Sequence, residues 1–329
     1  MSAAGPPQGA NHSPSGGSAA AALATEAASV GVNIATLVVV GVGLIGGSYA
    51  LALRAAGAAS RIVGVGRGRH NLDDALRRRI VDVAYALDED WASELAIADI
   101  VMVAAPLSQY PALLSMIAPA IGPQTIVTDA GSTKQDVVAT ARAVFHGAIA
   151  RFVPGHPIAG SEQSGALAAD GALFAGRNVV LTPVGETAPD ACALVTELWQ
   201  TCGARVTTMS PAAHDRVLAA VSHLPHVLAF TLVAELASRQ DSEALFSYAG
   251  TGFHDFTRIA ASSPSMWRDV ALANGAALQD ELARYRTALD TAARMLAEGD
   301  GAGLAALFER AAIARQRLDS STRTSGDTT

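Results

Sequence analysis

The sequence predicts an α/β domain with a doubly wound parallel sheet, followed by an all-α domain. In the first two thirds of the chain, short β-branched runs alternate with stretches of helical spacing, which is typical of parallel sheets. Beyond Met209 the chain has long Ala- and Leu-rich stretches with charges at helical intervals, and no strand candidate. The 329 residues also exceed the usual size of a single hydrophobic core. We therefore expect two folded domains, over 34–208 and 209–318.

Each predicted element follows from a local pattern. The run 35–40 is apolar and β-branched, and glycines separate it from an apolar helix-like stretch over 45–56. Further strands are expected at 61–65, 99–104, 125–128, 152–154 and 178–181, with helices between them such as 72–80 and 135–145. Long helices are expected over 212–238, 264–298 and 304–318. A strand, a turn and a helix also explain the uncharged run 27–53 better than a membrane span does.

Composition narrows the classes of partner. Half of the residues are hydrophobic and 16% are charged, which is typical of a folded protein. The net charge of −7 provides no overall positive field, so we expect no nucleic-acid partner and no membrane partner. The two cysteines, Cys192 and Cys202, are too few for a disulfide framework and fit a cytoplasmic location. A small-molecule partner is the remaining expectation.

Both ends of the chain are predicted to be disordered tails, over 1–33 and 319–329. The first consists of Ala, Gly, Ser and Pro with a single charge, Glu26, and shows neither a helical stripe nor an alternating pattern. It lacks the arginines or basic start of targeting peptides. The last eleven residues are polar.

The glycine pattern Gly41-Val42-Gly43-Leu44-Ile45-Gly46 matches a dinucleotide-binding fingerprint. It follows a predicted strand and opens a predicted helix, where the helix N-terminus would face a pyrophosphate. We therefore expect a Rossmann-like domain with Gly41, Gly43, Leu44, Ile45 and Gly46 at the cofactor. The alternative is a structural turn that has lost its ligand.

The end of the second predicted strand bears on the choice between NAD and NADP. An NAD-binding domain usually carries Asp or Glu there to bind the ribose hydroxyls, but this chain reads Val65-Gly66-Arg67-Gly68-Arg69. An arginine can pair with the 2′-phosphate of NADP, so the sequence slightly favours NADP, with Arg67 as the binding residue. Alternatively, both arginines are solvated loop residues.

Two polar residues follow later predicted strands, where ligands of open α/β sheets bind. Ser132 lies between a strand and a helix, so it is placed to meet cofactor or substrate, or else it caps the helix. His156 is held between Pro154 and Pro157, and an imidazole can accept a proton at neutral pH. His156 is therefore the candidate general base.

The helical part contributes further candidates. His223 and His226 are three residues apart, which suggests a metal site, but a polar substrate cleft without a metal explains them better. Arg258 follows a glycine-containing segment, and a guanidinium in a cleft can bind a carboxylate in bidentate fashion. A surface ion pair is the other possibility for Arg258.

Together these segments resemble the prephenate/arogenate dehydrogenase (cyclohexadienyl dehydrogenase) family of tyrosine biosynthesis. The matching segments occur in family order and cover roughly residues 36–315. They are Gly-Leu-Ile-Gly-Gly-Ser (43–48), Asp-Ala-Gly-Ser-Thr-Lys (129–134), Gly-His-Pro-Ile-Ala-Gly-Ser-Glu (155–162), Ser-His-Leu-Pro-His (222–226) and the series Phe-Thr-Arg-Ile-Ala to Met-Trp (256–267).

The resemblance implies an NAD(P)-dependent oxidative decarboxylation of prephenate to 4-hydroxyphenylpyruvate, or of arogenate to tyrosine. His156 would deprotonate the ring hydroxyl, and Ser132 would orient that hydroxyl and the nicotinamide. Arg258 would bind a substrate carboxylate, while His226 and Trp267 would shape the pocket.

The resemblance also implies further contacts and a homodimer formed through the helical domain. Supporting polar contacts would come from Glu162, His214, Asp215 and Asp255, and Thr251 would approach the partner's site. Some family members carry a lysine where this chain has His254, a position near the side-chain end of the substrate. No metal is required by this chemistry.

Two other classes of protein remain as alternatives. β-Hydroxyacid dehydrogenases also join a Rossmann-like domain to helices, but they rely on a lysine in the helical domain, and no lysine follows Lys134 here. The second alternative is a non-catalytic dimer that binds a nicotinamide nucleotide. It would leave His156 and Arg258 without a role.

Overall fold

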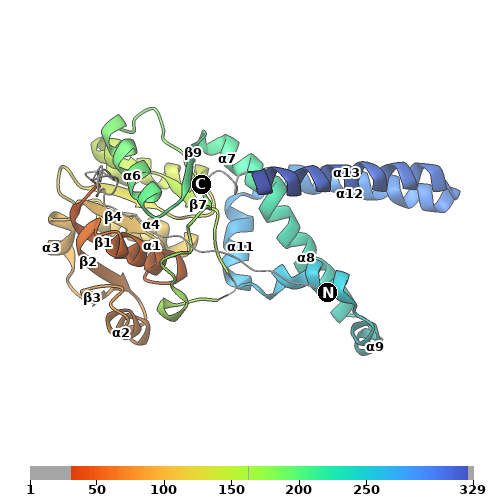
Figure 1. Ribbon diagram of the computed structural model, residues 1–329, viewed down its shortest axis with the longest axis horizontal. Coiled ribbons are helices and arrows are strands. Elements are labelled where there is room, and N and C mark those ends of the chain that lie inside the picture. Colours follow the sequence, from red (N-terminus) through yellow and green to blue (C-terminus); the bar gives the residue numbers. More distant parts are fainter. Residues whose placement is uncertain (1–30, 162, 325–329) are drawn as a thin grey trace, which may run out of the picture. The chain divides into compact units, whose positions relative to one another are not determined.

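A computed structural model of the protein describes residues 31–161 and 163–324, with side chains up to residue 318 (Figure 1). Its first part is built on a six-stranded, all-parallel sheet in the order β3-β2-β1-β4-β5-β6. The strands are β1 (Ile34–Val40), β2 (Ala59–Gly66), β3 (Val83–Ala86), β4 (Ile100–Val103), β5 (Ile126–Asp129) and β6 (Phe152–Val153). The strand order reverses between β1 and β4, where open α/β sheets bind their ligands.

Helices cover both faces of this sheet, because alternate residues of its strands are apolar on both sides. In β1, Leu37 and Val39 join one buried cluster, whereas Val38 and Val40 join the other. The connecting helices are α1 (Leu44–Ala55), α2 (Arg69–Arg77), α3 (Ala92–Ala96), η1 (Leu107–Gln109), α4 (Tyr110–Ile117), α5 (Gln135–Phe145) and η2 (His146–Arg151). The predicted doubly wound sheet is therefore confirmed.

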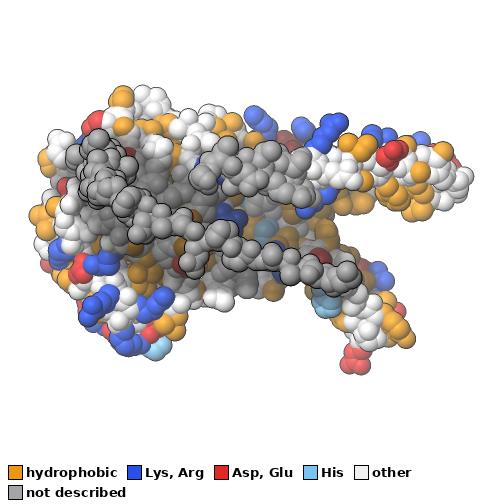
Figure 2. Space-filling model, in the orientation of Figure 1, with side chains coloured by type: hydrophobic (Ala, Val, Ile, Leu, Met, Phe, Trp, Pro, Cys, Tyr) orange, Lys and Arg blue, Asp and Glu red, His pale blue; other side chains and the backbone are white. Residues whose placement is uncertain are grey.

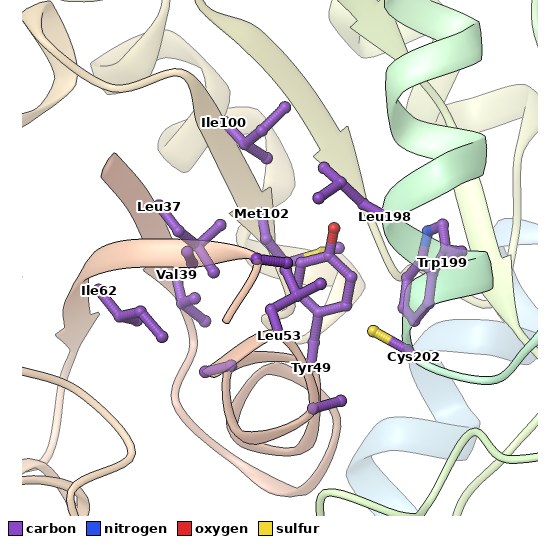
Figure 3. Close-up of a cluster of buried hydrophobic side chains, with 14 of the residues drawn as sticks. Leu37, Val39, Tyr49, Leu53, Ile62, Ile100, Met102, Leu198, Trp199 and Cys202 are labelled. Atoms are coloured by element: carbon purple, nitrogen blue, oxygen red, sulfur yellow. The ribbon is translucent and has the colours of Figure 1, made fainter. Parts of the chain in front are cut away.

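One of the two clusters joins the sheet to a helix far along the chain. Trp199 of α6 (Pro189–Thr201) packs against Tyr49 of α1, with ring centroids 4.5 Å apart (Figure 3). Both rings are fully buried. This packing holds the region after residue 154 against the dinucleotide-binding sheet.

A second, smaller sheet was not predicted. It contains β7 (Gly155–Pro157), β8 (Asn178–Leu181) and β9 (Arg205–Thr208), with β7 antiparallel and β9 parallel to β8, and η3 (Ala166–Ala168) precedes β8. The segment 178–181 was predicted as a strand, but β7 and β9 were missed. Neither has an apolar β-branched run, since β7 holds a histidine beside a proline and β9 is mostly polar.

The remainder of the described chain is helical, as predicted. Its helices are α7 (Pro211–Leu218), the π-helical turn η4 (Ala219–His223), α8 (Leu224–Ala237), α9 (Ser242–Ser247), α10 (Thr251–Thr257), η5 (Arg258–Ala261), α11 (Pro264–Ala273), α12 (Gly275–Glu298) and α13 (Gly301–Thr324). Asn274 divides the predicted helix 264–298 into two. Helix α13 runs to Thr324, so the disordered tail that was predicted over 319–329 is wrong for 319–324. Residues 1–30 of the other predicted tail lie outside the described residues.

The helical part exposes much apolar surface. The stretch Pro211–Ala237 is long and apolar enough to cross a membrane by length and composition alone, and 28% of its most apolar window is buried. Figures 1 and 2 show α12 and α13 extending together from the sheet domain, with apolar side chains along them. Large apolar side chains that are exposed here include Val221, Tyr248, Leu272, Leu289, Leu296 and Phe308.

Candidate active site

The glycine loop after β1 is shaped to approach a phosphate. Gly41 has a φ of 103°, and a Cβ there would lie 2.4 Å from the Ala104 carbonyl oxygen. A Cβ on Gly46 would lie 2.2 Å from the Gly41 carbonyl oxygen, so this glycine permits close packing of helix and strand. In contrast, a Cβ on Gly43 would meet no atom within 4 Å, which leaves open space at the start of α1.

The N-terminus of α1 has unmet backbone donors. Its N-cap is Gly43, which forms no side-chain cap, and its first turn, which begins with Leu44 and Ile45, contains no acidic residue. These N–H groups and the positive end of the helix dipole suit a pyrophosphate. The loop therefore fits the dinucleotide that its fingerprint predicts.

The arginines after β2 differ in their surroundings. Arg69 lies within ion-pair distance of Asp73 at 3.3 Å and of Glu89 at 3.5 Å. Arg67 is exposed and forms no ion pair with any described residue. Figure 2 shows basic side chains gathered over the region of α2. Arg67 is thus free to bind an anion beside the end of β2.

A buried ion pair positions the segments that carry Ser132 and His156. Lys134 Nζ lies 2.5 Å from Asp129 Oδ2 and donates to the Gly155 carbonyl oxygen at 2.7 Å. The other oxygen of Asp129 accepts from Gly155 N at 3.0 Å. The end of β5 is thereby fixed against β7, the strand of His156.

Ser132 is half-buried within this segment. The N-cap of α5 is Lys134, and no side chain caps that helix. The alternative of an ordinary helix cap at Ser132 is therefore wrong. Ser132 follows the end of β5, at the carboxyl edge of the sheet.

His156 faces a buried histidine and carboxylate from α7. Its Nδ1 lies 2.9 Å from His214 Nε2, and His214 Nδ1 lies 2.8 Å from Asp215 Oδ1. Asp215 also accepts the backbone N–H groups of Lys134 at 2.8 Å and Gln135 at 2.9 Å. The first and second parts of the chain therefore meet at this network.

Charges and burial keep His156 neutral. Burial lowers its pKa well below the usual 6.5, and His214, Lys134 and His223 lower it further. His156 nevertheless retains partial exposure. A neutral imidazole at a partly exposed position can accept a proton at neutral pH.

The π-helical turn η4 and the first turn of α8 place two more histidines, His223 and His226, at this interface. His226 stacks on Trp267, with ring centroids 3.5 Å apart, and its Nδ1 donates to the Ser222 carbonyl oxygen at 2.9 Å. His223 is buried, and its Nδ1 lies 3.1 Å from Asn274 Nδ2. These contacts occupy one nitrogen of each ring, and no group of three potential metal ligands occurs among the described residues.

The α10–η5 segment supplies the remaining candidates. Arg258 is exposed, forms no ion pair with a described residue, and lowers the pKa of His226, for which burial is the larger cause. A surface ion pair is therefore not its role in the described structure. Asp255 and Thr251 are exposed on α10. Glu162 lies outside the described residues.

Two residues of the site, Lys134 and Asn274, were not predicted from the sequence. Lys134 stands in a segment that was singled out, so a signal for it was present. His223 was predicted to line a polar cleft with His226, but it is buried. Asn274 donates to the Asp215 carbonyl oxygen at 2.7 Å and contacts His223. It lies inside a predicted continuous helix, and the sequence contains no signal for its role.

The fold and the site define an oxidoreductase with a dinucleotide-binding domain and a helical domain that meet at a histidine-rich interface. Residues 49–208 match the nucleotide-binding domain of prephenate dehydrogenase, and residues 210–310 match its dimerization domain. The chain therefore belongs to the prephenate dehydrogenase family, as its sequence motifs predicted. The cofactor class of its first domain is NAD(P).

Named relatives agree with this assignment. The chain is 34% identical to prephenate dehydrogenase of Bacillus subtilis, over 86% of this chain and 76% of that protein. It is 31% identical to cyclohexadienyl dehydrogenase of Zymomonas mobilis, over 86% and 95%.

A solved structure is similar over most of its length. Prephenate dehydrogenase of Aquifex aeolicus, in complex with hydroxyphenyl propionate and NAD+, has a TM-score of 0.82 and 32% identity. The match covers 87% of this chain and 99% of that one. Arogenate dehydrogenase of Synechocystis has a TM-score of 0.73 and 30% identity, covering 86% and 99%.

Proposed function

We propose that this protein catalyses the NAD(P)-dependent oxidative decarboxylation of prephenate to 4-hydroxyphenylpyruvate, of arogenate to tyrosine, or of both. The observation that carries the proposal is the position of His156, which is partly exposed, follows β6 at the carboxyl edge of a dinucleotide-binding sheet and contacts His214 through Nδ1. The cofactor, when bound, takes up a hydride. The ring carbon that bears the hydroxyl loses this hydride, the hydroxyl loses a proton, and the carboxylate leaves as carbon dioxide.

His156 and Ser132 act on the reacting end of the substrate. His156 accepts the proton of the ring hydroxyl, so that the carbon–oxygen bond gains double-bond character as the hydride departs. Ser132, on the segment that the Asp129–Lys134 ion pair holds, would orient that hydroxyl and would lie beside the nicotinamide of a bound cofactor. Loss of carbon dioxide makes the ring aromatic and supplies the driving force, so the site needs mainly to position the reactants.

The helical part binds the rest of the substrate. Arg258 pairs with a substrate carboxylate, because its guanidinium is exposed and has no described carboxylate partner. The stacked rings of His226 and Trp267 form an apolar wall for the substrate ring. Asp255, together with Glu162 of the first domain, supplies supporting polar contacts to the substrate. His214 and Asp215 give their support through the hydrogen bonds that reach His156.

The proposal includes a preference for NADP over NAD. Arg67 follows β2 directly, and no acidic residue stands at Gly66 or Gly68 to bind ribose hydroxyls. A free guanidinium at this place suits a 2′-phosphate. Gly41, Gly43, Leu44, Ile45, Gly46 and Ser132 complete the proposed cofactor site.

We further propose a homodimer formed through the helical domain, with Thr251 close to the partner's site. Exposed apolar side chains of α12 and α13, such as Leu289, Leu296 and Phe308, support it, because burial against a second copy would remove them from water. The domain boundary lies at 208/209, between β9 and α7. A cytoplasmic location agrees with two free cysteines, of which Cys202 is buried.

The test is a spectrophotometric assay for reduced cofactor, in which prephenate and arogenate are each combined with NAD and with NADP. We expect turnover with at least one combination, and higher kcat/KM with NADP. No turnover with any of the four would overturn the proposed function and favour a non-catalytic nucleotide-binding protein. Sedimentation of the purified chain tests the dimer, and a monomer at micromolar concentration would contradict it.

A further inference from the structure

The hydrogen-bond network that reaches His156 starts at the carboxylate of Asp215, which accepts hydrogen bonds and donates none. Both oxygens of Asp215 receive backbone N–H groups, from Lys134 and Gln135, and Oδ1 also faces His214 Nδ1 at 2.8 Å. Burial alone would raise the pKa of Asp215, but these hydrogen bonds outweigh it and the pKa is lowered. Asp215 is therefore ionised at neutral pH.

The carboxylate determines which nitrogen of His214 carries the proton. Because Asp215 accepts, Nδ1 of His214 donates, and in the neutral ring Nε2 is left with a lone pair. His214 is fully buried, so water does not compete for either nitrogen. Its Nε2 is then an acceptor that faces His156 Nδ1 at 2.9 Å.

The same reasoning extends to His156. Its Nδ1 donates to His214, so its second nitrogen, Nε2, carries the lone pair in the neutral ring. Without a partner at Nδ1, a neutral imidazole exchanges between two tautomers and only one of them leaves Nε2 free. The contacts thus select the tautomer that accepts at Nε2.

We propose that His214 and Asp215 are a positioning pair that holds a proton on Nδ1 of His156 and so reserves Nε2 as the base nitrogen. The inference rests on the proposed function in taking His156 as the proton acceptor. It resembles the way in which a buried aspartate orients the histidine of a hydrolase triad, with a second imidazole placed between the two. After proton transfer, the ionised Asp215 stabilises the imidazolium through His214.

Other charged and titratable groups surround His156. Lys134, held by Asp129, precedes α5, and His223 lies on η4. Neither forms a hydrogen bond with the His156 ring in the described structure, whereas His214 does. The tautomer of His156 is accordingly assigned to the α7 pair.

Nitrogen-15 NMR of the full-length protein, with labelled histidine, tests the assignment without any turnover. The chain has eight histidines, and His156→Gln and His214→Gln variants identify the two signals. We expect a protonated Nδ1 and an unprotonated Nε2 on His156 at pH 7.5. A proton on Nε2 of His156, as a doubly protonated His214 would produce, overturns the proposal.

Two variants of similar volume separate positioning from packing. The amide oxygen of His214→Gln can still accept from His156 Nδ1, whereas His214→Leu cannot. We expect His214→Leu to lower kcat roughly 100-fold or more with little change in KM, and His214→Gln to recover at least roughly tenfold of that loss. Equal kcat values for the two variants, at equal thermal stability, would overturn the positioning role.

The two proposals fail in different ways. If wild-type protein turns over neither substrate but His156 has a bare Nε2, the proposed function fails and the tautomer assignment stands. If turnover is present but Nε2 is protonated, the positioning role fails and the proposed function stands. His70→Gln, which removes a histidine exposed on α2, is the control for loss of a histidine and should leave kcat unchanged.

Discussion

Lys134 and Asp129 form an ion pair in which both side chains are completely buried, with Nζ and Oδ2 2.5 Å apart. Lys134 is the single lysine of the chain. Asp129 also accepts from Gly131 N, Gly155 N and the Tyr110 hydroxyl, so its carboxylate joins β5 to β7 and α4. The pair therefore fixes the strands that carry the site, but it is buried and cannot contact a substrate.

Replacing this lysine should strongly destabilise the fold. In Lys134→Met the carboxylate of Asp129 remains buried without a cation, and such a change costs about 3–5 kcal/mol of unfolding free energy. Urea denaturation measures it. The double variant Lys134→Met, Asp129→Asn should recover part of the loss, because the uncompensated charge is gone. A single variant within 1 kcal/mol of wild type would contradict this account.

The sequence predicted five of the six strands of the main sheet, because β-branched runs are local signals, but it missed β3, which contains a single β-branched residue. The strand at 178–181 has the predicted bounds, and β1 agrees within one residue. The sequence did not predict the strands of the second sheet, β7 and β9, whose pairing depends on residues far apart in the chain. β7, which carries His156, is a strand because it pairs with β8 in a second sheet.

The candidate site was also only partly predictable, because its motifs are local but its contacts are not. Motifs identified His156, Ser132 and Arg258 as single residues, but their partners come from other parts of the chain. The contact between His156 and His214 spans 58 residues, and the contact between Asn274 and His223 spans 51. Neither pairing has a local signature, so only the folded chain reveals the network.

His156→Asn should lower kcat by roughly 100- to 10,000-fold, since it removes a group that acts mainly in the transition state. KM should change little. Burial lowers the pKa of His156, and activity needs its neutral form. In wild type, kcat/KM should therefore stay constant as the pH is lowered through 6.5 and should decrease only at a pH well below that value. Steady-state kinetics from pH 5 to 8 check both points, and an unchanged kcat would exclude the catalytic role.

Arg258→Ala should affect mainly KM, whereas His156→Asn should affect mainly kcat. Loss of a charge-assisted contact to a substrate carboxylate should raise KM roughly 10- to 100-fold, with a smaller effect on kcat. Arg268→Ala is the matched control, because Arg268 already contacts Asp269 at 2.6 Å. If both variants saturate at the wild-type substrate concentration, Arg258 does not bind the substrate.

Arg67→Ala should weaken NADP more than NAD, because only NADP carries the 2′-phosphate. We expect KM for NADP to rise roughly tenfold and KM for NAD to stay within about twofold. Arg77→Ala, at the end of α2 and paired with Asp74, provides the control for loss of a nearby positive charge. Equal changes for the two cofactors would remove Arg67 from the cofactor site.

The free energy of unfolding should decrease as the pH is lowered from 6.5 to about 4, because of His223. Burial lowers the pKa of His223 from 6.5 to about 4, so the unfolded chain binds a proton below pH 6.5 while the folded chain does not. Unfolding free energy therefore rises with pH through this window, and His223 accounts for a loss of roughly 3 kcal/mol between pH 6.5 and 4.

Urea denaturation at several pH values tests this prediction. His156, whose pKa is lowered in the same direction, adds to the slope. His223→Gln should flatten the dependence between pH 6.5 and 4, because glutamine does not titrate and can still accept from Asn274. His70→Gln should leave the dependence intact, since His70 is 88% exposed. A slope unchanged in His223→Gln would mean that His223 is protonated in the folded state, with its charge balanced by Asp215.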